Sequence, residues 1–233
     1  DGIGWFAFET LKRITAEHPE YEFIFVFDRP FHPDFVFSSN VRAVVAPPPT
    51  RHPVLIFLWF ELSIPFLIRK FRPDVFLSPD GFLSLSAKVK SLTVIHDLNF
   101  EHNPQDLPWK YRVFYRFFFK RYAKKASRIA TVSEFSASDI SQHYSVIRDK
   151  IDVVYNGVAE GFKPLPPERI REIREEFSEG DPYFIFVGSI HPRKNIINLL
   201  KAFDLFRLRT SYPMNLLIVG KKQWCSSSIE ETH

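Results

Sequence analysis

Arg193 and Lys194 are adjacent cations at the point where an apolar strand pattern changes to a helical one, in the stretch IFVGSIHPRKNIINLL (185–200). An apolar repeat with the 3.6-residue period of a helix begins at Asn195. Two cations at the electropositive end of a helix repel each other and the helix dipole, and a bound anion offsets that repulsion. Arginine offers a planar fork and lysine a point charge, which together suit a diphosphate. The pattern therefore predicts an anion site, with an ordinary strand–helix loop as the alternative.

Other polar side chains follow predicted strands. VIHDLNF (94–100) ends a strand with His96 and Asp97. An imidazole at such an edge can hydrogen-bond a hydroxyl or assist a proton transfer, and the alternative is a structural histidine at a strand end. Ser133 is expected mainly to cap the helix that follows it. Asn156 can reach a ligand or shape a turn, in which Gly157 is expected to supply an unusual backbone angle.

A short glycine pattern opens the chain. GIGWFA (2–7) matches G-x-G-x-x-G/A, in which Gly2 and Gly4 would bring backbone N–H groups close to a phosphate, ahead of a helix over 5–16. Asp28 ends the next predicted strand, near where the ribose-binding acid of a dinucleotide site would lie. A phosphate-proximal loop, a NAD-type fingerprint and a plain turn all stay open. Because such a glycine turn normally follows a strand, we expect the chain to be a fragment that lacks its first strand.

The stretch WKYRVFYRFFFKRYAKKASR (109–128) carries eight Lys or Arg residues and no acid. Four of the cations recur every four residues and so share one helix face, and they are Arg112, Arg116, Lys120 and Lys124. The apolar residues Val113, Phe114, Phe117 and Phe118 are expected on other faces. Such a helix can rest on an anionic membrane as a peripheral contact. It can equally pack on the core with a solvated basic side, and the two hypotheses are compatible.

The composition limits the class of protein. With 233 residues, 45% hydrophobic residues and 26 phenylalanines, the chain can form one or two packed domains and is not disordered. Its single cysteine, Cys225, excludes an internal disulfide and suits a reducing compartment. The net charge of +4 permits anionic partners without requiring nucleic acid, and we expect no nucleic-acid partner. His96 and His102 have no cysteine or carboxylate cluster nearby in the sequence, so a metal site is not expected.

The longest apolar run is VLIFLWFELSIPFLI (54–68), which contains Glu61 and Pro65. A membrane span needs about 20 apolar residues. The run therefore predicts a buried helix over 51–71, kinked at Pro65. No signal peptide is recognisable at the start of the chain.

Strand and helix patterns alternate along the chain. Strands are expected at 21–28, 41–46, 74–78, 92–97, 128–133 and 151–158, with further helices at 107–126 and 134–144. This alternation predicts βαβ units and a mostly parallel sheet, whose ligands bind at the carboxyl ends of the strands. In this sequence, ligand-binding positions are therefore expected just after Asp28, Ser78, Asp97, Ser133 and Asn156.

A second α/β unit follows a proline-rich, charged segment. The segment 160–182, with a helix at 168–177, is expected to connect two domains. A strand at 183–187, a helix at 194–208 and a strand at 215–219 then follow. One strand–helix–strand unit is too small for an independent domain, so we expect this second domain to be cut as well.

Six stretches, taken in order, resemble the retaining glycosyltransferases of family 4 (group 1). They are GIGWFAFETLKRI, PDVFLSPDG (73–81), VIHDL (94–98), RIATVSEFSASDI (128–140), VVYNGV (153–158) and FVGSIHPRKNIINLLKAF (186–203). The overall pattern is most similar to mannosyltransferase-like members. The resemblance implies an α/β fold of the two-domain GT-B type, with parallel sheets in two Rossmann-like domains. The first, acceptor-side domain would span 1–158, the connection 159–182, and the start of the nucleotide-sugar-binding domain 183–233.

The resemblance also implies the reaction and its residues. A hexose, with mannose as the candidate, would pass from a GDP- or UDP-linked sugar to a saccharide or lipid-linked acceptor with retention, in polysaccharide biosynthesis. Arg193 and Lys194 would bind the donor diphosphate and stabilise the leaving phosphate, and Gly2 and Gly4 would lie near it. His96 would be the catalytic residue beside the transferred sugar. Apart from the resemblance, Asp97, Ser133, Asn156, Gly188 and Ser189 are expected near the substrate because they lie at the ends of predicted strands. No cofactor or metal is implied, and no Asp-x-Asp motif occurs.

The resemblance implies further features of the whole enzyme. The E-x7-E carboxylates of the family should lie beyond residue 233, since Glu230 and Glu231 are too early and too close together. We therefore expect little or no transfer activity from residues 1–233 alone. A cytoplasmic location, peripheral on the inner face of the membrane, is also expected. The alternative hypotheses are an NAD-dependent Rossmann enzyme and a non-catalytic sugar-binding remnant.

Overall fold

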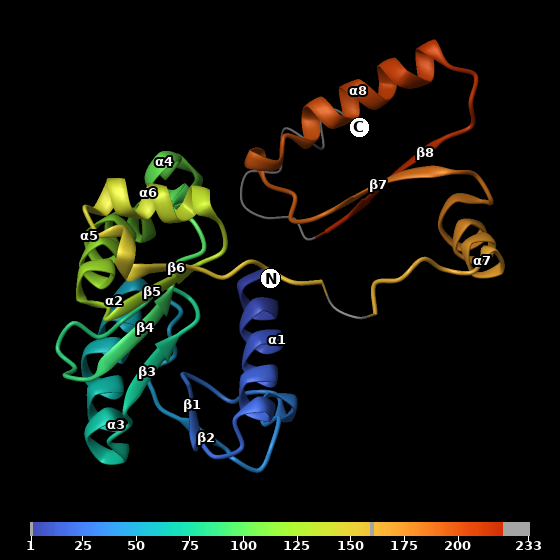
Figure 1. The fold of residues 1–233 in the computed structure, drawn as a ribbon. Helices are drawn as coiled ribbons and strands as arrows, with labels where there is room; N and C mark the ends of the chain where they lie inside the picture. The colour runs from blue at the N-terminus through green and yellow to red at the C-terminus, as the bar shows by residue number, and fades with distance from the viewer. Residues whose placement is uncertain (1, 159–160, 221–233) are drawn as a thin grey trace. The chain divides into compact units, whose positions relative to one another are not determined.

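The computed structural model describes residues 2–158 and 161–220. The chain divides into two compact units, Asp1–Gly157 and Val158–His233, each of which is described separately below. All five strand pairings within the described ranges are parallel. The predicted α/β class with parallel sheets is therefore confirmed (Figure 1).

The main sheet of the first unit contains four parallel strands in the order β3-β4-β5-β6. They are β3 (Val75–Ser78), β4 (Lys90–Val94), β5 (Arg128–Thr131) and β6 (Ile151–Val153). The connections after β4 and β5 contain the helices α4 (Asn99–His102), α5 (Trp109–Lys125) and α6 (Glu134–Tyr144). Because the strands are parallel, all four carboxyl ends meet at one edge of the sheet.

The first two strands of the chain form a sheet of their own. β1 (Phe23–Phe27) pairs with β2 (Val41–Val45), and helix α1 (Gly2–Glu17) precedes them. Aromatic contacts join the helix to β1 through the segment between the strands, since Phe8 packs edge-on against Phe35 and Phe37, whose rings in turn contact Phe27 and Phe25. The prediction of one sheet for this half was wrong in this respect. Residue periodicity identifies a strand but not the strand beside which it lies.

The long apolar run folds into one helical segment with an internal irregularity. It contains α2 (Pro53–Leu58), a π-helical turn η2 (Trp59–Ser63) and α3 (Ile64–Phe71). The predicted kink at Pro65 is therefore a widened turn just before the proline, whose missing N–H cannot bond the preceding turn. The Glu61 carboxylate accepts the backbone N–H groups of Leu85 at 2.6 Å and Ser86 at 3.1 Å. These two hydrogen bonds to Glu61 therefore hold the loop between β3 and β4 against the helical segment.

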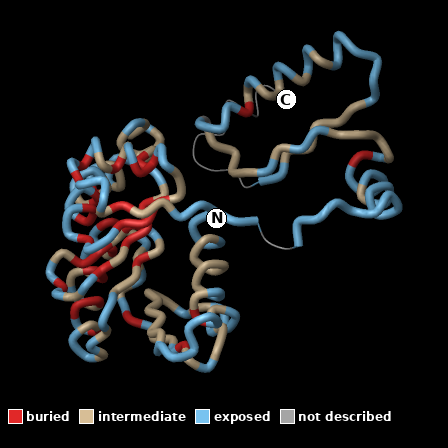
Figure 2. Tube along the Cα trace, viewed as in Figure 1, coloured by how far each residue is buried: buried red, intermediate tan, exposed pale blue. Residues whose placement is uncertain are grey.

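The core of the first unit lies between its main sheet and helices α5 and α6, where the buried residues concentrate (Figure 2). Fully buried members include Leu83, Ile95, Tyr122, Ile129 and Ile140. A second cluster joins α2, η2 and α3 to α5 through Trp59, Phe60 and Phe114. The core therefore supports the main sheet on the face that α5 and α6 cover.

The second unit contains α7 (Pro167–Ser178), β7 (Tyr183–Val187), α8 (Ile196–Arg209) and β8 (Asn215–Val219). β7 and β8 form a two-stranded parallel sheet. Rings of α8 pack on one of its faces, since Phe184 contacts both Phe203 and Phe206. Short 3-10 turns complete the two units at Pro33–Phe35, Pro104–Asp106, Arg148–Lys150 and Pro192–Lys194.

Candidate functional site

His96 lies at the carboxyl edge of the main sheet, two residues after β4 ends. The intervening Ile95 is held by the neighbouring strand: its N–H donates to Ala130 O at 2.9 Å, and the Thr131 hydroxyl donates to Ile95 O at 2.6 Å. The half-buried imidazole places Nε2 3.1 Å from Pro79 O. On another side it meets the Phe6 ring edge-on, with 4.8 Å between ring centroids. Two segments distant in sequence, those of Pro79 and Phe6, therefore contact His96, and β5 holds the residue before it.

The contact with Pro79 determines which nitrogen of His96 carries the proton in its neutral form. A carbonyl oxygen can only accept, so Nε2 must donate and Nδ1 keeps its lone pair. Nδ1 has no hydrogen-bond partner among the residues that the structure describes. His96 can therefore accept a hydrogen bond from an external hydroxyl at Nδ1.

Asp80 is a neighbour of His96 that the sequence reasoning missed. It interacts electrostatically with His96 and accepts a hydrogen bond from Ser78 Oγ at 2.9 Å. Loss of water around the carboxyl group raises the pKa of Asp80, although the residue as a whole is exposed and hydrogen bonds oppose the rise. The signal was present, because Asp80 follows β3 at the same sheet edge as Ser78. A carboxyl group thus belongs to the surroundings of His96.

Asp97 and Ser133 hold local structure together at this edge. Asp97 is exposed, and its Oδ1 accepts the Asn99 N–H at 2.9 Å at the start of α4. Ser133 Oγ accepts the Ser136 N–H at 3.1 Å, so the expected helix cap on α6 is confirmed. Their contact with a substrate stays a prediction.

The segment after His96 is anchored to two helices. The Glu101 carboxylate accepts a hydrogen bond from Arg116 Nε at 3.1 Å and another from Tyr144 OH at 3.0 Å. The next residue, His102, pairs with Asp139 through Nε2 at 2.8 Å. These contacts of α4 with α5 and α6 restrain the loop that carries His96 and Asp97.

Asn156 and Gly157 lie beyond β6 in irregular backbone, and both are exposed. The expected unusual backbone angle at Gly157 was wrong, because its φ lies outside the left-handed range and a Cβ there would meet nothing within 4 Å. No backbone conformation therefore requires glycine at this position.

Gly2 and Gly4 were predicted to form a turn ahead of a helix. They lie instead in the first turn of α1. The helix pattern was placed too late because glycine has a low helix propensity and was taken as a boundary. A Cβ on Gly2 would meet nothing within 4 Å, so this end of α1 has open space beside it. The contact of Phe6 with His96 brings the same helix end to the carboxyl edge of the main sheet.

The Asp28 carboxylate is occupied by its own chain. Arg29 donates to both of its oxygens at 2.9 and 2.5 Å, and Thr50 donates through N at 2.6 Å and Oγ1 at 2.7 Å. Burial alone would raise the pKa of Asp28, but these hydrogen bonds outweigh it and lower the pKa to about 2. The ribose-binding acid of a dinucleotide site needs free acceptor oxygens, so this arrangement argues against that alternative.

Arg193 and Lys194 lie at the carboxyl end of β7, in the second unit. They belong to the 3-10 turn Pro192–Lys194, held by the Lys194 N–H bonded to His191 O at 2.8 Å. Helix α8 begins later than predicted, after Asn195 in the left-handed conformation. Both cations are exposed, and neither forms a salt bridge with a residue in the described ranges. The pair is therefore available to an external anion.

Gly188 and Ser189 begin the loop that carries the two cations. The Gly188 N–H donates to Val219 O at 2.9 Å, which joins the exits of β7 and β8. Gly220 is needed there, because a Cβ on it would lie 1.7 Å from Gly188 O. This close approach fixes the point from which the loop departs.

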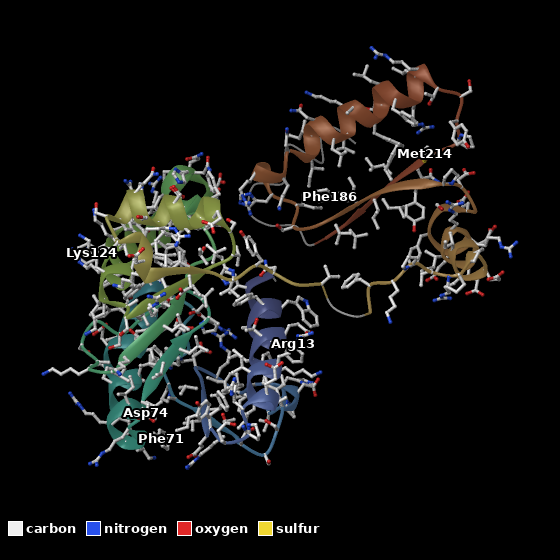
Figure 3. The ribbon with its side chains drawn as sticks, viewed as in Figure 1. Arg13, Phe71, Asp74, Lys124, Phe186 and Met214 are labelled. Carbon is white, nitrogen blue, oxygen red and sulfur yellow. The ribbon has the colours of Figure 1, made fainter. Side chains whose placement is uncertain are left out.

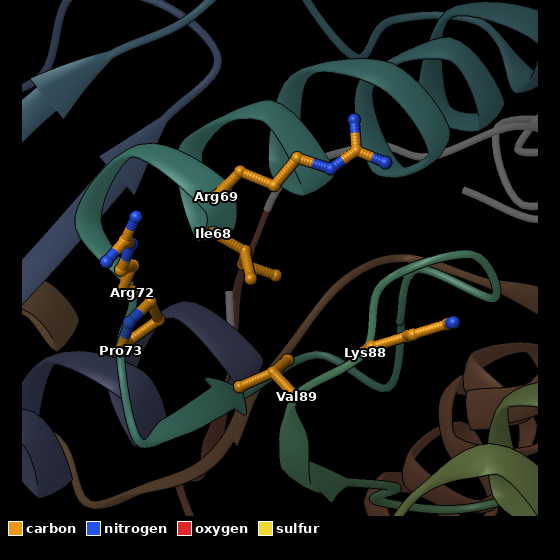
Figure 4. A pocket seen from close by; sticks show the side chains of 6 residues that line it. All are labelled: Ile68, Arg69, Arg72, Pro73, Lys88 and Val89. Atoms are coloured by element: carbon orange, nitrogen blue, oxygen red, sulfur yellow. The ribbon is translucent and has the colours of Figure 1, made fainter.

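A shallow groove of about 440 Å³ lies elsewhere on the first unit, lined by Ile68, Arg69, Arg72, Pro73, Lys88 and Val89 (Figure 4). Its three cations point in different directions rather than toward one point. Arg72 and Lys88 precede β3 and β4, so the groove is at the amino ends of these strands. It therefore lies away from the edge that carries His96.

Three further observations concern the described ranges alone. They contain no group of three or more His, Cys, Asp or Glu side chains that could hold a metal ion. No helix in them is long and apolar enough to cross a membrane. Cys225, Glu230 and Glu231 lie outside these ranges.

Two curated proteins illustrate what the chain is similar to. O-antigen chain mannosyltransferase B of Escherichia coli is 25% identical over 170 residues, which cover 67% of this chain and 41% of that protein. O-antigen chain mannosyltransferase RfbU of Salmonella typhimurium is 29% identical over 131 residues, which cover 52% of this chain and 33% of that protein. The chain thus matches less than half of the length of either relative.

Two solved structures share the fold. Anabaena Alr3699/HepE in complex with UDP and glucose has a TM-score of 0.65 at 16% identity, covering 97% of this chain and 61% of that one. A glycosyltransferase from Rickettsia africae ESF-5 has a TM-score of 0.56 at 17% identity, covering 88% of this chain and 53% of that one. At these identities the likeness extends to the fold alone.

The family models match nearly the whole chain. The model described as Glycosyltransferase Family 4 matches residues 1–161, and that described as Glycosyl transferases group 1 matches residues 168–233. The first match alone covers more than half of the chain, and it contains His96, while the second contains Arg193 and Lys194. The chain therefore belongs to Glycosyltransferase Family 4 and has the α/β fold of the GT-B type.

Proposed function

We propose that the protein containing this chain transfers a hexose from a nucleotide diphosphate sugar to a saccharide or lipid-linked acceptor, with retention of the anomeric configuration. The observation that carries the proposal is the Arg193–Lys194 pair, exposed and without an ion-pair partner in the described ranges, at the carboxyl end of β7. Ligands of parallel α/β sheets bind at such strand ends. Two cations side by side match the two phosphates of a nucleotide diphosphate.

The leaving group in such a reaction is the nucleoside diphosphate, on which negative charge builds as the sugar–phosphate bond breaks. Arg193 and Lys194 would stabilise that charge electrostatically, and more strongly in the transition state than in the bound donor. First-turn N–H groups of α8 are a further source of positive potential, because the Asn195 side chain makes no capping hydrogen bond to them. No metal ion is needed in this proposal.

His96 would bind the transferred sugar. Its Nδ1 lone pair can accept a hydrogen bond from a sugar hydroxyl, and Pro79 O and the Phe6 ring would hold the imidazole in that orientation. Asp97, Ser133 and Asn156 would lie near the substrate on the first unit, with Gly188 and Ser189 on the second. Gly2 and Gly4 would lie near the donor diphosphate.

The curated relatives support mannose as the transferred sugar, since those quoted above are O-antigen mannosyltransferases. The complex of the Anabaena protein with UDP and glucose supports a nucleotide-linked sugar as the donor class. Membership of Glycosyltransferase Family 4 supports the class of reaction, and retention is what the resemblance to retaining enzymes of that family implies.

Titration calorimetry of the 233-residue chain with GDP, UDP and NAD, with EDTA present, tests the proposal. We expect binding of GDP or UDP, loss of about tenfold or more of that affinity in R193Q/K194Q, and no binding of NAD. K201Q/R209Q is the matched control, because it removes the same charge from exposed positions of α8. Equal affinities of the two double variants would contradict the diphosphate role, and preferential NAD binding would favour the dinucleotide alternative.

A further inference from the structure

Helix α5 presents a combined apolar and basic surface to solvent. Trp109, Val113 and Phe117 recur every four residues and lie on one side of the helix, with exposed fractions of 64%, 59% and 50%. Six exposed cations accompany them on that side, namely Lys110, Arg116, Lys120, Arg121, Lys124 and Lys125. We call these nine residues the α5 outer face. Helix α5 itself contains no acid, and the Glu101 carboxylate that contacts Arg116 has only 4% of its side chain exposed.

The opposite side of α5 packs against the core of the first unit. Phe114, Phe119, Tyr122 and Ala123 are buried against the rest of the first unit. This packing fixes the rotation of the helix and leaves the α5 outer face toward solvent. The sequence prediction had placed Val113 and Phe117 on other faces than the cations, and it was wrong on this point. Arg112, predicted to share the basic face, is instead half-buried at its margin.

Most of the positive charge on the α5 outer face is not neutralised within the first unit. Arg116 is the exception, since its Nε donates to Glu101 at 3.1 Å. Arg121 lies over the Phe117 ring, 3.6 Å from the centroid, and keeps its charge at the surface. Lys120 and Lys124 form no salt bridge in the described ranges, and Lys124 points away from the unit (Figure 3). Apolar and cationic groups are thus exposed together.

We propose that the α5 outer face docks the protein on an anionic lipid surface. A headgroup layer accepts both kinds of side chain: Trp109 and Phe117 enter the boundary of the acyl region, while the cations meet lipid phosphates. Each Lys or Arg close to such a surface strengthens binding, and the attraction falls with salt. Nucleic acid fits less well, because the exposed Trp109, Val113 and Phe117 side chains need an apolar layer that a phosphate backbone does not offer. The inference is independent of the proposed function.

Co-sedimentation with vesicles tests this docking. The 233-residue chain should bind vesicles of equimolar phosphatidylglycerol and phosphatidylcholine and should bind pure phosphatidylcholine far more weakly. K120Q/R121Q/K124Q should lower partitioning to the anionic vesicles on the order of 100-fold. K12Q/K70Q/K88Q removes the same charge from exposed positions of the first unit and should change partitioning less than about threefold.

The apolar part of the face is tested separately. W109S/F117S should lower partitioning about tenfold or more even at high salt, whereas F135S, at an exposed position of α6, should not. Brominated acyl chains should quench tryptophan fluorescence of the chain, and the quenching should fall in W109F. Far-UV circular dichroism checks that each variant is folded. Equal binding to both vesicle types, or wild-type binding by K120Q/R121Q/K124Q, would overturn the proposal. Binding of RNA or of a protein by the α5 outer face, without binding of vesicles, would also overturn it.

Discussion

The two compact units of the chain are built from the same strand–helix–strand pattern, yet they bury their apolar residues very differently (Figure 2). In the first unit, helices α5 and α6 and the four-stranded sheet enclose one large buried cluster. In the second, Ile196 is the one buried hydrophobic residue in the described part, and Ile185 and Val187 of β7 are exposed. Parallel sheets need cover on both faces. A correct βαβ pattern therefore does not ensure a complete core.

The largest expected contrast appears when the units are separated. We expect residues 1–157 to unfold cooperatively on heating, because the buried cluster is contained within them. Residues 158–233 should show no cooperative transition, since so little apolar surface is buried in the described part of that unit. Thermal circular dichroism and amide hydrogen exchange measure both. A sharp transition in residues 158–233 would show that the second unit has a cooperative core of its own.

Single truncations should reproduce this contrast at smaller scale. Ile140 of α6 is fully buried, so I140A should cost about 2–5 kcal/mol of unfolding free energy by leaving a cavity. Leu208 of α8 is 83% exposed, and L208A should cost less than about 0.5 kcal/mol. Urea unfolding of the 233-residue chain measures both. Similar costs would mean that α8 is packed against more apolar surface than its exposure indicates.

Two glycines of the first unit differ in how closely their surroundings pack. Gly81 has φ of +90°, and a Cβ there would lie 2.7 Å from the buried Phe119 ring, so G81A should cost about 1–3 kcal/mol. Gly157 has neither restriction, and G157A should change stability by less than about 0.5 kcal/mol. The urea unfolding midpoints of G81A and G157A measure the two changes in stability. Tolerance of G81A would show that Phe119 can move, and the core would be looser than its burial indicates.

The smallest expected effect concerns Asp28, at the margin of the first unit. Its pKa is lowered from 3.8 to about 2, so its contacts stabilise the fold above about pH 4. That stabilisation is lost as pH falls from about 4 through about 2, because Asp28 has the higher pKa in the unfolded state, which therefore takes up the proton first. D28N should lower stability at neutral pH on the order of 1 kcal/mol, after solvent screening is allowed for, and should flatten the dependence below about pH 4. D34N, at an exposed position, should leave the acid limb of the stability curve unchanged.

Sequence reasoning located most helices and strands because each is set by local periodicity. The strands Tyr183–Val187 and Asn215–Val219 and the helix Glu134–Tyr144 have the predicted bounds. The predictions were wrong where one local sequence signal is compatible with two different structures. Glycines taken as a turn begin α1, and a proline expected to kink a helix follows a π-helical turn.

The candidate site was predicted in part for the same reason. The rule that ligands bind at strand ends predicted the edge that carries His96, Asp97 and Ser133, and the strand–helix junction after Val187 singled out Arg193. It could not show that Asp28 is occupied by Arg29, since this depends on how a side chain is oriented and solvated. The proximity of Asp80 to His96 likewise arises only when β3 and β4 pair.

The order of residues along the chain was enough to determine the family, the parallel α/β class and the strand ends that His96, Asp97, Ser133 and Arg193 follow. These follow from periodicity and from short motifs, which are local properties. Tertiary structure alone decided that β1 and β2 leave the main sheet, that Pro79 and Phe6 enclose His96, and that α5 turns its apolar and basic residues outward together. Each of these depends on which distant surfaces are buried against one another, and that choice is made by the packed core as a whole.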